Sequence, residues 1–163
     1  MSFAELRIDE LLFAPGLGAF YYDDQAAIAA GAALDGFVYS GPPVTAGFMQ
    51  VRMPAESLSI GLRLSDGHIA WGDMMSVQYS GAGGRESGFS ADKARQIVEQ
   101  RLRSRMIGLS VANFVPACDG LFDDVRGCGP AIEYGVSQAL LRAAAHARRV
   151  SYSRRRELTV PRA

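Results

Sequence analysis

The chain has 163 residues, of which 48% are hydrophobic and 21% charged, and its formal net charge is zero. This length fits one domain, and the apolar share is sufficient for an ordinary core, which excludes a disordered chain. A zero net charge gives no indication of a nucleic-acid or membrane partner. With two cysteines, no signal peptide and no run of 18 or more apolar residues, we expect a reduced, cytoplasmic protein.

The charges are unevenly distributed. Between Arg142 and Ala163 there are seven arginines and one acid, Glu157. Such a tail could bind nucleic acid through the phosphate backbone. Cations at the end of a helix also suit the negative end of the helix dipole, and we favour this second interpretation.

The first part of the chain predicts extended and irregular structure. Residues 3–14 indicate a strand or extended segment that Pro15 and Gly16 interrupt. Residues 16–47, rich in Gly, Ala and aromatic residues, indicate a long irregular region, and long loops in compact domains are often functional. Within it we expect one short helix over 24–33.

Three strand signals follow. Alternation of apolar and polar residues with a period of two predicts strands over 49–53 and 58–64. The Ser-Asp-Gly sequence at 65–67 predicts a hairpin turn, because Asp-Gly suits the positive dihedral angles of such turns. A third strand is expected over 68–77, so that these strands form an antiparallel meander.

Beyond the meander, the hydrophobic period becomes helical. Ser90 could cap a helix that Gly108 ends. Pro116 is expected as the first residue of a second, shorter helix. Gly129 and Pro130 open a third helix with the apolar stripe Ile132, Val136, Leu140, Ala143 and Ala147. Strands followed by helices indicate an α+β domain.

The glycine-rich residues 80–85 are the first candidate for chemistry. Their order does not match the dinucleotide fingerprint G-x-G-x-x-G, and the Gly-Lys-Ser/Thr of a P-loop is absent. The segment could be a tight turn, or a loop whose backbone approaches a ligand closely. The residues alone leave both interpretations open.

No catalytic or metal cluster emerges from spacing. His68, His146 and the two cysteines lack the spacing of a zinc site. Each histidine is expected to face solvent or to be a satisfied part of the core. Asp23 and Asp24 are adjacent but lack a third ligand. From the residues alone, the interpretation stops at an α+β domain.

Several stretches of the chain form an ordered set of motifs, of which the most specific is VQYSGAGGR at 77–85. The others are 15–25, 35–39, 44–48, 50–52, 113–114 and 132–140. In content, order and spacing these stretches resemble the methylaspartate ammonia-lyase family of the enolase superfamily, and the resemblance covers about residues 8–150.

The resemblance implies the N-terminal capping domain of an enolase-superfamily enzyme: an α+β domain with a three-stranded antiparallel meander followed by helices. The TIM-type barrel on which this cap sits is absent from the chain. We therefore assign residues 1–150 to the cap and 151–163 to an Arg-rich C-terminal tail.

The implied reaction is the reversible elimination of ammonia from 3-methylaspartate, a small amino diacid, to give mesaconate in glutamate degradation. The family uses Mg²⁺, but its catalytic base and its metal ligands belong to the barrel. No catalytic residue and no metal ligand is therefore assigned in this chain, and whether it is an enzyme on its own is left open.

The resemblance assigns substrate binding to Gln78 and Tyr79. Gln78 matches the glutamine by which the family's cap reaches the substrate, and an amide can both donate and accept hydrogen bonds. Residues 16–25 form a second candidate rim. The alternative for Gln78 is a polar strand-end residue in a turn. The loop expected near the site comprises Ser80, Gly81, Gly83, Gly84 and Arg85.

The expected partner is a barrel domain or a separate barrel chain, with no nucleic acid and no membrane. Association of several copies is left open. The alternative function is a non-catalytic remnant, or a binding module that reuses the cap surface.

Overall fold

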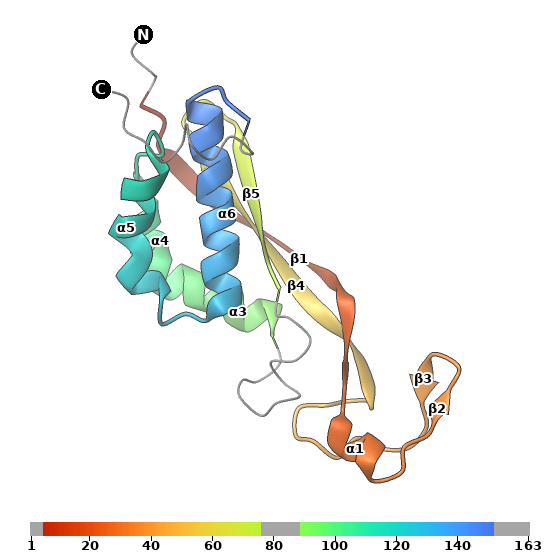
Figure 1. Cartoon of the computed structure of the whole chain (residues 1–163). Helices are drawn as coiled ribbons and strands as arrows, with labels where there is room; N and C mark the ends of the chain where they lie inside the picture. The colour runs from red at the N-terminus through yellow and green to blue at the C-terminus, as the bar shows by residue number, and fades with distance from the viewer. Residues whose placement is uncertain (1–4, 76–88, 152–163) are drawn as a thin grey trace.

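The computed structural model describes residues 5–75 and 89–151. Figure 1 shows two parts, a body in which helices lie over a sheet and a distal lobe, residues 17–53, at the far end of a twisted β-ribbon. The elements in chain order are β1 (Ile8–Asp23), α1 (Gln25–Ala29), β2 (Leu34–Asp35), β3 (Val38–Tyr39), β4 (Arg52–Leu64), β5 (Ile69–Met74), α3 (Ala91–Ile97), η1 (Val98–Leu102), α4 (Arg103–Met106), α5 (Phe114–Val125) and α6 (Pro130–Ala147).

The main sheet has three antiparallel strands in the order β1-β4-β5, which confirms a three-stranded antiparallel sheet followed by helices. The prediction of which segments form the three strands of this sheet was wrong, because residues 49–53 do not form a strand of their own. Arg52 already belongs to β4, and β1 supplies the third strand. The long pairing of β1 with β4 sets the length of the ribbon.

The expected break at Pro15 and Gly16 was also wrong. Pro15 pairs with Leu58 and Gly16 with Ser57, so β1 continues through both. Proline removes a backbone donor, but β1 is an edge strand whose outer side needs no ladder partner. The pairing is irregular on either side of these two residues, with register shifts between Ile8 and Glu10 and between Leu17 and Tyr21.

The helices cover one face of the sheet and bury the core. Leu58, Ile60, Leu62 and Leu64 alternate along β4 and are all at most 1% exposed. This confirms the period-two pattern of the sequence. Each residue of the apolar stripe expected on α6 is also buried.

Helix α6 lies unusually close to β5. A Cβ added at Gly72 would collide with the carbonyl oxygen of Gly135, and one added at Gly135 would collide with Met74. Only glycines at these two positions allow this approach, since every other residue carries a Cβ. The helix therefore holds the last residues of β5 directly.

Turn and helix signals were confirmed to within a few residues. Gly67 in the hairpin turn and Gly108 after α4 both have positive φ, of 86° and 81°. The first helical segment is interrupted by η1, a π-helical turn. Helix α5 begins at Phe114, two residues before Pro116. Within the described ranges, no helix is long and apolar enough to cross a membrane.

Candidate functional site

The residues predicted to bind substrate or to lie near the site fall between β5 and α3, outside the described part of the chain: Gln78, Tyr79, Ser80, Gly81, Gly83, Gly84 and Arg85. The structure describes the frame that holds both ends of this segment. Met74 and Met75 lie on one side of it, and Phe89 and Ser90 lie on the other.

The upstream end of the frame is held by α6. The backbone N–H of Asp73 donates to Oε1 of Gln138 at 3.2 Å, and Nε2 of Gln138 donates to the hydroxyl of Tyr134 at 2.8 Å. On the other side, the hydroxyl of Ser59 donates to Oδ1 of Asp73 at 2.6 Å. Because β5 is an edge strand, Gln138 satisfies an N–H that no neighbouring strand reaches.

The downstream end is held by β4. The backbone N–H of Ala91, the first residue of α3, donates to Oε2 of Glu56 at 2.7 Å. Ser90 occupies the N-cap position, but its side chain makes no capping hydrogen bond. A carboxylate from a distant strand therefore takes the role expected of Ser90, which suits the positive end of the helix dipole.

The second predicted rim, residues 16–25, meets the same frame. A Cβ added at Gly18 would collide with the sulfur of Met75 and lie 3.3 Å from the carbonyl oxygen of Ala55. The structure thus brings β1 against Met75, the last described residue before the predicted substrate segment.

Asp24 fixes the fold of the distal lobe. The residue is only 1% exposed, and its carboxylate caps α1 by accepting a hydrogen bond from the N–H of Ala27 at 3.2 Å. It also accepts from the N–H of Val44 at 2.7 Å and from the N–H and hydroxyl of Thr45 at 2.8 and 2.6 Å. Burial would raise the pKa of Asp24, but these hydrogen bonds outweigh it and hold the pKa far below its ordinary value.

Arg52 makes the second lock of the lobe. Its guanidinium donates two hydrogen bonds of 2.7 Å to the carboxylate of Asp23 and one of 3.0 Å to the carbonyl of Phe37. It also lies 5.0 Å from the ring centres of Phe37 and Tyr39. Asp23 and Asp24 therefore have structural partners of their own and do not form a joint carboxylate site.

The described histidines come together, which spacing did not reveal. The rings of His68 and His146 stack with centres 3.7 Å apart, and Nε2 of His146 lies 2.7 Å from Oδ2 of Asp66. The contact with His146 lowers the pKa of Asp66. Burial, followed by the charge of His146, lowers the pKa of His68. The cluster joins the β4–β5 turn to the last turn of α6.

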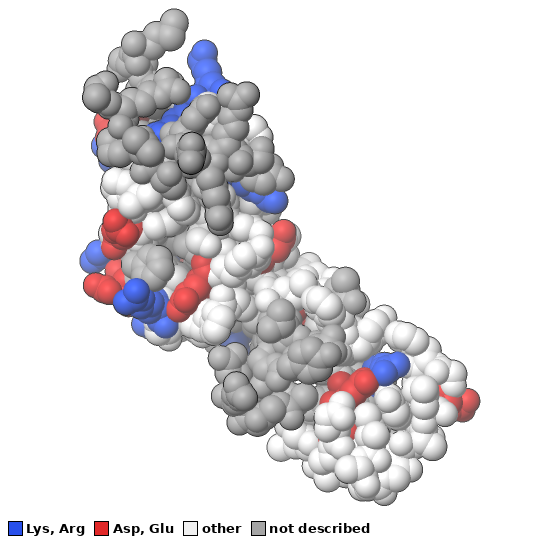
Figure 2. All heavy atoms as spheres, in the orientation of Figure 1, with Lys and Arg blue, Asp and Glu red and all other residues white. Residues whose placement is uncertain are grey.

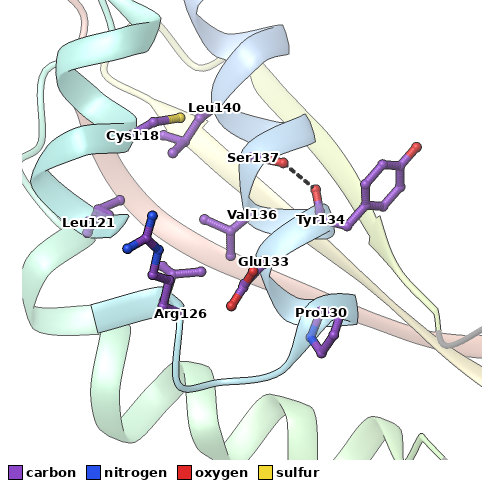
Figure 3. A pocket seen from close by; sticks show the side chains of 10 residues that line it. Cys118, Leu121, Arg126, Pro130, Glu133, Tyr134, Val136, Ser137 and Leu140 are labelled. Carbon is purple, nitrogen blue, oxygen red and sulfur yellow. Dashed lines mark hydrogen bonds between the residues drawn. The ribbon is translucent and has the colours of Figure 1, made fainter. Parts of the chain in front are cut away.

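A cavity of about 350 Å³ lies between α5 and α6 (Figure 3). Cys118, Val136 and Leu140 contribute to a mainly apolar lining, with Arg126 and Glu133 at one end. Burial, with a smaller effect of Asp119, raises the pKa of Cys118 to about 11. A thiol with this pKa is protonated at neutral pH and is therefore a poor nucleophile.

Among residues 5–75 and 89–151, no three His, Cys, Asp or Glu side chains are arranged to hold a metal ion. The arrangement that remains is a hydrogen-bonded frame on both sides of residues 76–88, with an irregular lobe beside it. Such a frame can present a side chain to a substrate held elsewhere.

Residues 6–154 match the family model described as the methylaspartate ammonia-lyase N-terminus. The chain is 45% identical to methylaspartate ammonia-lyase of Clostridium tetanomorphum over 150 residues and 44% identical to that of Haloarcula marismortui over 152. Each match covers 90% of this chain and 36% of the relative, so the chain spans about a third of the length of these curated relatives.

Solved structures give the same result. β-Methylaspartase of Clostridium tetanomorphum in a magnesium complex aligns with a TM-score of 0.80 at 45% identity, covering 90% of this chain and 36% of that one. Citrobacter amalonaticus methylaspartate ammonia lyase containing (2S,3S)-3-methylaspartic acid aligns with a TM-score of 0.78 at 42% identity and the same coverage. A muconate lactonizing enzyme of Pseudomonas fluorescens, 18% identical with a TM-score of 0.53 over 87% of this chain and 31% of that one, shares the fold.

Proposed function

Because this chain belongs to the methylaspartate ammonia-lyase family, in the part that the family's N-terminal model describes, we propose that it is the capping domain or small subunit of such a lyase. The reaction is the reversible elimination of ammonia from 3-methylaspartate to give mesaconate, in glutamate degradation in the cytoplasm. The observation that carries this proposal is 45% identity over 90% of the chain. The part of each relative that lies outside the match would contain the barrel domain. Without a barrel domain, this chain would be inactive.

The proposed boundary places the cap at residues 1–150 and an Arg-rich tail at 151–163. Helix α6 ends at Ala147, and the family match ends at residue 154, which supports a boundary between them. No role in nucleic-acid binding is assigned to the tail.

The proposed contribution of the cap is Gln78, with Tyr79 beside it. The amide of Gln78 can accept a hydrogen bond from the ammonium group of the substrate and donate one to a carboxylate. The loop of Ser80, Gly81, Gly83, Gly84 and Arg85 would then exclude water from the substrate. The frame built by Gln138 and Glu56 supports this role, because it holds both ends of the segment.

Magnesium would supply positive charge where the carboxylate of the substrate gains negative charge. The described residues of this chain do not form a ligand set for it. We therefore assign the ion and the catalytic base to the barrel.

Reconstitution tests the proposal. The chain is mixed with the separately expressed barrel portion of the Clostridium tetanomorphum lyase, 3-methylaspartate and Mg²⁺, and mesaconate is followed by its ultraviolet absorbance. We expect turnover from the mixture and none from either part alone. Gln78→Ala should lower the turnover about 100-fold if its hydrogen bonds strengthen in the transition state, whereas Gln96→Ala, at an exposed position on α3, should not.

A second candidate function is a binding module that reuses the cap surface. It is favoured by the apolar side chains that the distal lobe exposes. Binding of the barrel portion without any mesaconate would favour this alternative. Unchanged turnover in Gln78→Ala would instead refute the assigned substrate contact.

A further inference from the structure

The cavity between α5 and α6 is formed by two helix faces that do not fill the space between them. The lining residues follow helical spacing on both helices, with Cys118, Leu121 and Val125 on α5 and Glu133, Val136 and Leu140 on α6. Protein interiors are close-packed and leave few voids larger than a water molecule. A cavity of about 350 Å³ between two packed helices is therefore large enough to hold a ligand.

The floor of this cavity is apolar. Leu121, Val136 and Leu140 belong to the main core and are at most 2% exposed, so packing on their other sides holds them in place. Burial raises the pKa of Cys118 to about 11, which keeps this thiol uncharged at neutral pH. The floor therefore accepts an aliphatic or aromatic group and disfavours a charged one.

The end of the cavity beside the α5–α6 connection is charged. Figure 3 shows the side chains of Arg126 and Glu133 at this end, and those of Cys118 and Leu140 at the other. In Figure 2, positive and negative side chains lie close together over the end of the helical body where α5 leads into α6. A guanidinium has five N–H donors and a carboxylate has two acceptor oxygens, so each can bind a ligand as well as a partner in the protein.

The connection that carries Arg126 is held in place by its neighbours. The guanidinium of Arg101 donates to the carbonyl oxygen of Gly127 at 2.8 Å and to that of Asp124 at 3.3 Å. The thiol of Cys128 donates to the carbonyl oxygen of Asp124 at 3.2 Å. The backbone beside Arg126 is therefore fixed without a ligand, which lowers the entropy that binding costs.

We propose that this cavity is a binding site for a small α-amino acid with an uncharged, apolar side chain. The carboxylate of the ligand lies at Arg126, its ammonium group lies at Glu133, and its side chain lies on the apolar floor. The size fits this ligand. An apolar cavity of about 150 Å³ can bind benzene, and ligand sites in general begin at about 300 Å³.

The same chemistry sets the selectivity of the site. A second carboxylate, as in 3-methylaspartate, would lie on the apolar floor, where burying an unpaired charge is costly. An acid without an ammonium group would leave Glu133 without a ligand group to bind, and an amine without a carboxylate would do the same to Arg126. The site therefore favours a ligand with both charges at one end and an apolar group at the other.

Titration calorimetry of the full chain with L-leucine and with L-phenylalanine tests the site. We expect at least one of them to bind with a Kd below about 1 mM. The matching acid, which lacks the ammonium group, and the matching amine, which lacks the carboxylate, should each bind about tenfold more weakly, since each loses a charged hydrogen bond. L-Aspartate should not bind. Amide chemical shifts should change mainly in α5 and α6.

Substitutions in the lining locate the ligand. Glu133→Gln and Arg126→Gln each remove one charge and should raise the Kd about tenfold. The matched controls Asp123→Asn in α5 and Lys93→Gln in α3 remove the same charges at exposed positions outside the lining, and should leave the Kd nearly unchanged. Ser137→Phe places a ring in the cavity and should abolish binding. Circular dichroism checks that each variant is folded.

Three results would overturn the proposal. The first is no saturable binding of either amino acid up to about 10 mM. The second is equal affinity for the amino acid and for its matching acid or amine, which would leave no role for the charged end. The third is binding that Glu133→Gln and Arg126→Gln leave unchanged. The barrel portion takes no part in these measurements, so none of the three would affect the proposed function.

Discussion

Asp66 and His146 are 80 residues apart in the chain but 2.7 Å apart in space, and His68 stacks on the same imidazole. The charged or titratable groups facing His68 are Asp66 from the turn and His146 from α6. Arg7, whose backbone N–H donates to the hydroxyl of Ser65 in the same turn, directs its guanidinium to Gly108 and Glu5. A proton on His68 would therefore meet a partly buried site and a second imidazole at stacking distance.

This arrangement predicts a loss of stability in mild acid. The pKa of His68 is lowered below 6.5 in the folded chain, so the unfolded chain binds this proton more readily. The neutral form of His68 contributes fully to the stability of the fold above pH 6.5. This contribution to stability is lost as the pH falls below 6.5 toward the lowered pKa of His68 in the folded chain. Melting curves between pH 5 and 8 should show a drop of a few degrees toward pH 5.5. His68→Asn should remove the part of this drop that lies just below pH 6.5; an unchanged profile would contradict the assignment.

Among the elements, α6 can cross β5 closely only because Gly72 and Gly135 carry no side-chain atoms at the crossing. Gly72 faces the backbone of Gly135 and Ala139, and backbone cannot move aside as a flexible side chain does. The same crossing brings Gln138 to the open edge of β5. The helix thus packs on the strand and also accepts a hydrogen bond from an N–H group at the edge of that strand.

Gly72→Ala should lower the free energy of unfolding by about 3 kcal/mol, because its Cβ would overlap the carbonyl oxygen of Gly135. The matched control is Gly120→Ala in α5, where an added Cβ meets nothing within 4 Å. That change should raise stability by about 0.5–1 kcal/mol, since alanine restricts the unfolded chain and favours helix. Urea denaturation measures both. Equal effects of the two substitutions would exclude a tight crossing.

Across the whole molecule, the core and the distal lobe differ in how much buried apolar surface stabilises them. The continuous core lies under α3–α6, whereas the lobe depends on polar contacts with few buried apolar side chains. Segments with little buried apolar surface open locally at lower cost than the core. The two ends of one ribbon therefore differ in stability, although β1 and β4 run through both.

Amide hydrogen exchange followed by mass spectrometry should reveal this difference. We expect amides of α1, β2 and β3 to exchange at least tenfold faster than those at the centre of β4. Asp24→Asn replaces the carboxylate that accepts hydrogen bonds from Val44 and Thr45 with a weaker acceptor. It should therefore accelerate amide exchange in the lobe further and leave exchange in the helical body unchanged. Asp35→Asn, at an exposed position in β2, is the control. Uniform acceleration of the whole chain would show that lobe and body open as one unit.

The sequence by itself determined the features that depend on near neighbours. Alternation along 58–64 identified the buried face of β4, Gly67 the turn, and Gly129 with Pro130 the start of α6. Ordered motifs also identified the family, which residues 6–154 match. The hydrophobic period and the residues of a turn depend only on consecutive positions, so they can be recognised in a single sequence.

Only the tertiary structure decided the features that join distant residues. It paired β1 with β4 through Pro15, gave Glu56 the capping role expected of Ser90, and stacked His68 on His146. It also showed that seven large apolar residues of the distal lobe are exposed, whereas only small parts of the lobe are buried. The physical reason is that pairing, capping across elements and exposure depend on which surfaces the folded chain brings together, and these surfaces are not neighbours in the sequence.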